Sequence, residues 1–136
     1  MTAIGTPRLR ESSDSLLRFA MRADAVLTGL AGIAGIPLAN WMAEISGTTP
    51  AFEYALSAFF IAYGVVVLAL AQLPAVRTPG IAVACANVAY TVAAVAFVVS
   101  GIMPLTTTGV VLTLATGVYT LVFAELQYQG VRRIKR

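Results

Sequence analysis

The stretch that decides the fold is Thr49–Pro74, with the sequence TPAFEYALSAFFIAYGVVVLALAQLP. Its apolar part, residues 52–73, has the length of about 20 residues that a helix needs to cross the hydrocarbon core of a bilayer. Thr49 can cap the N-terminus of such a helix, and Pro50 suits the first turn, where a backbone N–H has no helical partner. Pro74 closes the stretch. The sequence therefore predicts a transmembrane helix with sharply marked ends.

Three further stretches have the same character. They predict spans at residues 19–39, 80–103 and 105–128, with Pro37 near the end of the first and Pro79 at the start of the third. The chain is 59% hydrophobic and 11% charged, and its mean hydropathy is +0.86. Soluble domains have about 45–50% apolar and about 25% charged residues. A chain of this composition needs lipid around it.

We therefore expect one all-α membrane domain, a four-transmembrane-helix bundle over residues 18–130. A tail of residues 1–17 precedes it, and a short basic tail of residues 131–136 follows it. The segment after the first span, Asn40–Ser46, is expected either to continue that helix or to form a short interfacial one. Trp41 in this segment suits the headgroup level, where tryptophan is enriched.

The distribution of basic residues predicts the topology. The two connections on the opposite side, residues 40–52 and 101–108, contain no Lys or Arg. Short loops rich in Lys and Arg stay in the cytoplasm, so both termini are expected inside, with the basic groups near anionic headgroups. The nine basic residues are Arg8, Arg10, Arg18, Arg22, Arg77, Arg132, Arg133, Lys135 and Arg136.

Composition also argues against several classes of function. Cys85 is the only cysteine, and there is no histidine, so thiol exchange, which needs two cysteines, and histidine-based metal or haem sites are not expected. The net charge of +3 is not accompanied by a nucleic-acid-binding motif. We expect no bound metal, no cofactor, no nucleic-acid partner and no catalytic residues.

Four polar residues are the candidates for a ligand or ion site. Asp24 and Glu125 are acidic residues within predicted spans, and an ionisable group inside a membrane is costly enough to indicate function. Glu44 and Glu53 are discounted because they fall at the interface. Measured along the helices, Asp24, Gln72, Asn87 and Glu125 are expected at similar depth, near the cytoplasmic face. They predict a polar vestibule that opens to the cytoplasm.

A structural alternative exists for these acidic residues. Asp24 could pair with Arg18, Arg22 or Arg77, and Glu125 could reach interfacial water, because burial costs little near an interface. The deeper tyrosines, Tyr63, Tyr90 and Tyr119, are expected to form hydrogen bonds within the bundle. None of the three is expected beside a base.

The chain also has traces of an internal repeat. Residues 64–73 align without gaps to residues 117–126, which places Gln72 opposite Glu125. Asp24 aligns with Asn87 at a second offset, and Thr28 aligns with Thr91. This similarity predicts two tandem helical hairpins in the same orientation.

Two stretches resemble a known group of proteins. LRFAMRADAVLTG, at residues 17–29, and FAELQY, at residues 123–128, look like small four-span membrane proteins of unknown function from actinobacteria. The layout is also similar, more distantly, to DoxX-like four-span proteins, some of which are tied to redox systems. The resemblance implies a bacterial cytoplasmic membrane, and the use of Arg in preference to Lys agrees with a high-GC genome.

Three functions are compatible with these observations. The first is a non-enzymatic accessory subunit of a cell-envelope assembly, because small residues on every span suit contact with a partner membrane protein or a second copy. The second is a small dimeric transporter or channel that uses Asp24 with Asn87 and Glu125. The third is an enzyme acting on a lipid or quinone, with Asp24 or Glu125 as acid or base.

Overall fold

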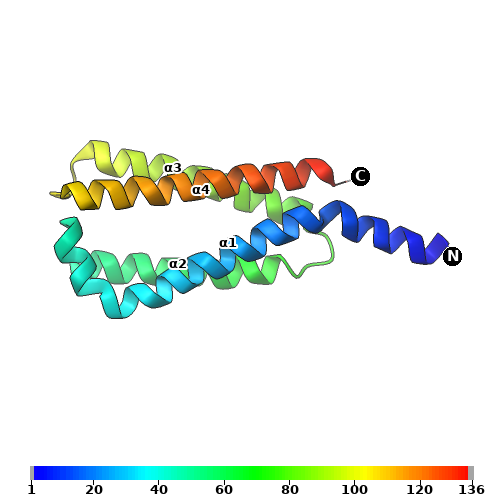
Figure 1. The fold of residues 1–136 in the computed structure, drawn as a ribbon, viewed down its shortest axis with the longest axis horizontal. Coiled ribbons are helices and arrows are strands. Elements are labelled where there is room, and N and C mark those ends of the chain that lie inside the picture. Colours follow the sequence, from blue (N-terminus) through cyan, green and yellow to red (C-terminus); the bar gives the residue numbers. More distant parts are fainter. Residues whose placement is uncertain (1, 135–136) are drawn as a thin grey trace.

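The chain folds into an elongated bundle of four helices (Figure 1). The structure is a computed structural model that describes the backbone of residues 2–134 and the side chains of residues 13–134. Each helix contains a segment long and apolar enough to cross a membrane, so the predicted all-α, four-span fold is confirmed. The helices are α1 (Thr2–Ser46), α2 (Pro50–Leu70), α3 (Arg77–Ser100) and α4 (Thr107–Arg133).

The helix ends follow the predicted signals, with one large difference. The N-cap of α2 is as expected, because the Phe52 N–H donates to Thr49 Oγ1 at 3.1 Å and Pro50 is the first helical residue. Helix α1 differs, since it begins at Thr2 within the predicted N-terminal tail. It also continues through Pro37 to Ser46, so Asn40–Ser46 is the end of the first helix and not a separate element.

The four helices form two hairpins. Helix α1 packs along α2, and α3 packs along α4, while the hairpins meet mainly where α1 contacts α4. Helices α2 and α3 make no comparable contact. Figure 1 shows the resulting separation of the two pairs toward the end opposite the termini. The tandem-hairpin arrangement is therefore present, and the proposed duplication behind it stays a prediction.

Small residues set the closest helix crossings. Gly64 on α2 lies against the α1 backbone, so that a Cβ added at Gly64 would come within 2.7 Å of the Ala25 carbonyl oxygen and 2.9 Å of Gly29 Cα. In the second hairpin, Thr91 on α3 donates to the Gly117 carbonyl of α4 at 2.9 Å. Both are the close backbone approaches and interhelical hydrogen bonds typical of membrane bundles.

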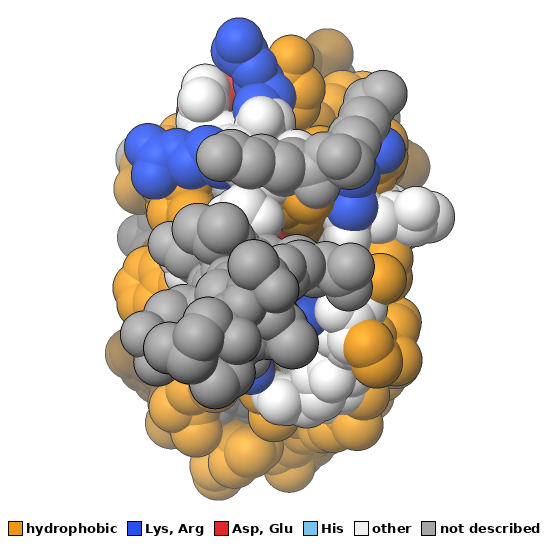
Figure 2. All heavy atoms as spheres, turned by 90° about the vertical axis from the view of Figure 1, so that its right-hand side faces the viewer, with side chains coloured by type: hydrophobic (Ala, Val, Ile, Leu, Met, Phe, Trp, Pro, Cys, Tyr) orange, Lys and Arg blue, Asp and Glu red, His pale blue; other side chains and the backbone are white. Residues whose placement is uncertain are grey.

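Both termini lie at one end of the bundle, here called the terminal end (Figure 1). Figure 2 looks onto this end and shows Lys and Arg side chains at its rim. The described basic residues lie toward this end of the bundle: Arg77 starts α3, Arg132 and Arg133 end α4, and Arg18 and Arg22, within α1, contact the residues that follow α2. This placement is what the predicted topology requires, and the cytoplasmic location of this end stays a prediction.

At the far end, α1 turns toward the second hairpin. Figure 1 shows its last turns, beyond Pro37, rising toward the start of α4. A proline within a helix removes a backbone hydrogen bond and permits such a bend. The Thr106 N–H then donates to the Ser46 carbonyl at 3.0 Å, and Gly109 leaves room for the Ser46 backbone. The bent end of α1 thus joins the two hairpins across the far end.

Arg18 binds backbone carbonyl groups immediately after the C-terminus of α2. Its guanidinium donates to the carbonyl oxygens of Ala71 at 3.0 Å, Leu73 at 2.7 Å and Pro74 at 2.9 Å, and forms a salt bridge with Asp14 at 3.1 Å. A basic side chain at a helix C-terminus satisfies carbonyl groups that have no helical partner. Arg18 therefore serves α2 and is not available to Asp24.

Replacing Arg18 with alanine is expected to lower the free energy of unfolding by about 2 kcal/mol, because three carbonyl groups lose a charged donor. Circular dichroism during unfolding in mixed micelles measures the change. Arg22→Ala is the matched control, since Arg22 makes one exposed hydrogen bond, to Gln72 Oε1 at 3.2 Å. Equal stability of the two variants would contradict a capping role for Arg18.

Candidate functional site

Asp24 is the centre of a buried polar network between the hairpins. Its side chain comes from α1 and has no exposed surface. Such burial follows from position, because Met21 and Ala25 on the same face of α1 are also buried and pack in the hydrophobic core. A carboxylate in this environment must be hydrogen-bonded to be tolerated, and the surrounding helices supply the donors.

Five side chains donate hydrogen bonds to the Asp24 carboxylate, and all four helices take part. Oδ2 accepts from Tyr63 at 2.6 Å, Asn87 at 3.0 Å and Gln127 at 3.0 Å. Oδ1 accepts from Thr28 and from Tyr119, both at 3.1 Å. The network is closed by a further bond, from Asn87 Nδ2 to Gln127 Oε1 at 2.9 Å.

The network is neutral apart from Asp24 itself. Two of the arginines named as alternative partners bind elsewhere: Arg18 binds Asp14 and carbonyl groups just after α2, and Arg22 binds Gln72. The only salt bridge among the described side chains joins Arg18 and Asp14. Pairing of Asp24 with an arginine is therefore contradicted, and amide and hydroxyl donors satisfy its carboxylate oxygens.

The structure brings two of the four predicted site residues together. Asp24 and Asn87 are in direct contact and are buried. Gln72 and Glu125 are exposed: Gln72 accepts from Arg22 at 3.2 Å, and Glu125 accepts from Gln129 at 2.8 Å. Gln72 and Glu125 are predicted at a similar depth to Asp24 and Asn87, but their side chains lie on the outside of the bundle.

Four members of the network were not predicted as site residues from the sequence: Thr28, Tyr63, Tyr119 and Gln127. Gln127 is fully buried and lies two residues beyond Glu125, on the other face of α4. Tyr63 and Tyr119 form the internal hydrogen bonds that were expected of deep tyrosines. Both hydroxyls, however, touch a carboxylate, so the expectation that neither has a base beside it is wrong. The sequence offered no signal that separates Gln127 from Glu125: Gln127 shares a helix face with Ala124, three residues earlier, but the burial of Ala124 is known only from the structure.

An apolar layer separates Asp24 from the terminal end. Leu17 and Met21, on the same helix, have no exposed surface. Leu17 is held tightly, because a Cβ added at Gly80 would lie 2.5 Å from its Cδ2 and one added at Gly130 would lie 2.7 Å from its Cα. The predicted vestibule on the terminal side of Asp24 is therefore filled by packed side chains.

The open space lies on the other side of the network, toward the far end. A cavity of about 670 Å³ runs between the hairpins, and its walls are mostly apolar and aromatic. Thr28, Tyr63, Asn87 and Tyr119, all from the Asp24 network, line one end of it. The direction predicted for the site is thus reversed, because Leu17 and Met21 fill one side and the splayed hairpins leave the other side empty.

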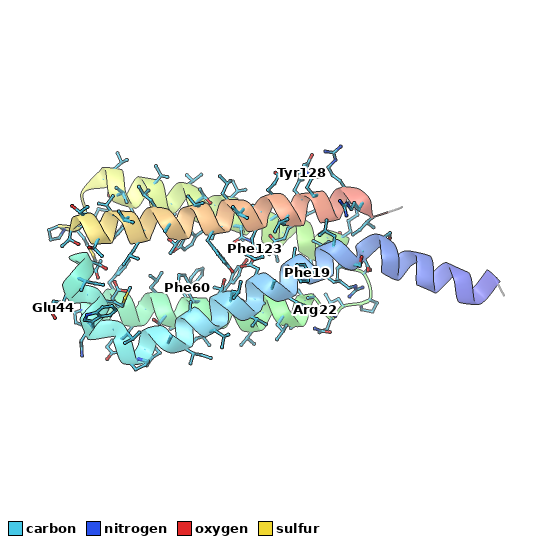
Figure 3. All side chains as sticks on the ribbon, viewed as in Figure 1. Phe19, Arg22, Glu44, Phe60, Phe123 and Tyr128 are labelled. Carbon is cyan, nitrogen blue, oxygen red and sulfur yellow. The ribbon has the colours of Figure 1, made fainter. Side chains whose placement is uncertain are left out.

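Aromatic rings bridge the cavity between α2 and α3. Phe60, labelled between the hairpins in Figure 3, has its ring centroid 6.1 Å from that of Tyr90. Nearer the far end, the rings of Phe52 and Phe97 stack with centroids 5.3 Å apart. All four rings line the cavity. These contacts join two helices whose backbones do not pack directly.

The far end of the cavity carries a second acid, Glu53. This side chain is 8% exposed, accepts a hydrogen bond from Thr48 and lines the cavity. Glu44 is different: it is exposed, and Figure 3 shows it at the outside of the far end. From the sequence, Glu53 is discounted as interfacial, because its position in the chain does not reveal that its side chain is buried beside Thr48 at the cavity.

Tyr63 and Glu53 mark the two ends of the cavity on α2. They are ten residues apart, or about 15 Å at 1.5 Å per residue. Lys and Arg are absent from the lining, and no group of three His, Cys, Asp or Glu among the described residues is placed to hold a metal ion. The geometry suits an elongated, mainly apolar molecule with hydrogen-bonding groups at one or both ends.

Comparisons with protein-family models, with curated proteins and with solved structures found no match to this chain.

Proposed function

We propose that this multi-pass membrane protein binds an amphipathic small molecule in the cavity between its hairpins. The polar group of that molecule would lie at the Asp24 network, and its apolar part would extend toward the far end. The observation that carries the proposal is the cavity itself, about 670 Å³ with apolar walls and polar ends. Small-molecule sites have volumes of about 300–1,000 Å³ and the same division between apolar walls and few polar groups.

Side-chain packing within the bundle does not explain why this cavity is open. Protein interiors are close-packed, and empty spaces larger than a water molecule are few. The terminal half of the bundle meets this standard, with Leu17 and Met21 fully buried. The far half does not, although Ala31 and Ala93 are positions where larger side chains would fill the gap. A bundle that keeps small residues around an open space is suited to an occupant.

The small residues that favoured an accessory subunit are partly used inside the bundle. Gly29 and Gly64 form the α1–α2 crossing, and a Cβ added at Gly32 would lie 2.6 Å from the Ser57 carbonyl oxygen. Their positions thus support internal packing more than contact with a partner. The accessory function, the transport function and a location in a bacterial cytoplasmic membrane stay predictions. The cavity directly supports ligand binding.

The proposal predicts that Ala93→Trp abolishes ligand binding while the fold is retained. Ala93 lines the cavity from α3, so the added indole would occupy space that the ligand needs. With radiolabelled 1-dodecanol as the probe and protein in lipid nanodiscs, specific retention is expected to fall at least about tenfold, since the occupied volume cannot be shared. Empty nanodiscs measure the amount held by lipid alone.

Ala89→Trp is the matched control. Ala89 lies one turn earlier on α3, is exposed and does not line the cavity. This variant is expected to retain the probe as the unchanged protein does, with the same helical content by circular dichroism. If the protein retains no more 1-dodecanol than empty nanodiscs, or if both tryptophan variants behave alike, ligand binding in this cavity is wrong.

A further inference from the structure

The hydroxyl groups at the network end of the cavity direct their protons toward Asp24. The Tyr63 hydroxyl donates to Oδ2 at 2.6 Å. The acceptors within reach of the Tyr119 hydroxyl are Asp24 Oδ1 at 3.1 Å, the Asp24 carbonyl at 3.3 Å and Thr28 Oγ1 at 3.1 Å. Each phenol has one proton, so both protons remain inside the network. What Tyr63 and Tyr119 can offer to the cavity is oxygen lone pairs.

The remaining groups at this end have the same property. Asn87 uses its two amide hydrogens within the network, for Asp24 Oδ2 at 3.0 Å and Gln127 Oε1 at 2.9 Å. Its side-chain oxygen is left as an acceptor. The Thr28 hydroxyl contacts only Asp24 and Tyr119 among its recorded partners, both at 3.1 Å. The network end of the cavity is therefore a surface of acceptors.

The charged residues around the cavity also favour a head group that donates hydrogen bonds. Asp24 lies directly behind this surface, Glu53 lines the far end, and the described residues of the lining include neither Lys nor Arg. An anionic head group would meet a carboxylate at either end without a cation to compensate it, which is costly in a low-dielectric site. A head group that donates hydrogen bonds meets partners at both ends.

We infer that the cavity selects amphipathic molecules whose head group is a hydrogen-bond donor, an aliphatic alcohol or a primary ammonium. It rejects carboxylates, phosphates and head groups that only accept, such as ethers and ketones. This inference rests on the proposed function and deepens it. The physical basis is that a donor is satisfied by the lone pairs of Tyr63, Tyr119 and Asn87, whereas an acceptor placed there leaves two sets of lone pairs facing each other.

Competition against radiolabelled 1-dodecanol in nanodiscs tests the selectivity. Dodecylamine and unlabelled 1-dodecanol are expected to compete at least about tenfold better than methyl dodecyl ether and dodecanoic acid, the difference made by one unsatisfied buried hydrogen bond. Comparing the amine with the alcohol shows whether charge adds to hydrogen bonding. A preference for the ether or the acid would overturn the inference.

Asp24→Asn is expected to reverse part of this preference. An asparagine amide placed at the Oδ1 position donates to Thr28 and Tyr119. The Thr28 proton then loses its carboxylate acceptor and can be offered to the cavity, while Tyr119 can still donate to the backbone carbonyl of residue 24. The ether should then compete with the alcohol to within a few-fold. Tyr119→Phe provides a second variant with the carboxylate intact: it removes one acceptor, and should weaken the alcohol several-fold without changing the ether.

The outcomes separate the inference from the proposed function. If all four compounds compete equally and Ala93→Trp blocks them all, the cavity binds apolar chains regardless of the head group. The inferred selectivity is then wrong, while the proposed function stands. If neither Asp24→Asn nor Tyr119→Phe changes how well the alcohol competes relative to the ether, the Asp24 network does not contact the head group, and the inference is wrong. If nothing is retained above empty nanodiscs, both are wrong.

Discussion

Replacement of Asp24 with leucine is expected to lower the free energy of unfolding by about 3 kcal/mol. Four donors on the other helices and Thr28 on α1 lose their acceptor. Interhelical hydrogen bonds in membrane bundles contribute on average about 0.6 kcal/mol each, and the buried donors left unpaired add to the loss. Because donors from every helix converge on this one carboxylate, the loss should loosen both hairpins together. Unfolding followed by circular dichroism in mixed micelles measures the change.

Asp24→Asn is the matched control, since it retains the shape and three of the five acceptor contacts at Oδ2 if its amide nitrogen replaces Oδ1. Thr28 and Tyr119, which face that position, can accept because they are hydroxyls. A loss of about 1 kcal/mol is therefore expected. If leucine is tolerated as well as asparagine, the network contributes nothing to the stability of the bundle, and its role is confined to the cavity.

Gly64→Ala is expected to destabilise the protein by about 2 kcal/mol, in the range found for overpacked cores. The added methyl would lie 2.7 Å from the Ala25 carbonyl oxygen and 2.9 Å from Gly29 Cα. These are backbone atoms of α1, so relief requires the two helices to move apart. The displacement would reach Tyr63, the neighbour of Gly64, and with it the hydrogen bond to Asp24.

The same crossing provides its own control. A Cβ added at Gly29 would have Gly64 Cα as its nearest neighbour, at 3.8 Å, which is ordinary van der Waals contact. Gly29→Ala is therefore expected to leave the unfolding free energy unchanged within about 0.5 kcal/mol. Equal effects of the two substitutions would show that general loss of glycine, and not the contact at Gly64, governs stability.

The part of the fold that the sequence determined by itself is the part set by interactions between neighbours along the chain. Span length, the Thr49-Pro50 start of α2 and the distribution of basic residues depend on local composition and on partition between lipid and water. Those signals predicted four helices and an arrangement with both termini at one end. They also identified Asp24, because an acid within an apolar helix is conspicuous wherever its partners lie.

The tertiary structure alone decided which polar groups meet. Gln127, and not Glu125, reaches Asp24 because the rotation of α4 turns that face inward, and periodicity in an apolar helix with few polar residues does not reveal this rotation. Burial of Glu53 depends on how the far end of the bundle packs around Thr48 and the cavity. The cavity arises because α2 and α3 stay apart while α1 and α4 pack. Each of these depends on the relative placement of helices distant in sequence, which packing across the bundle determines.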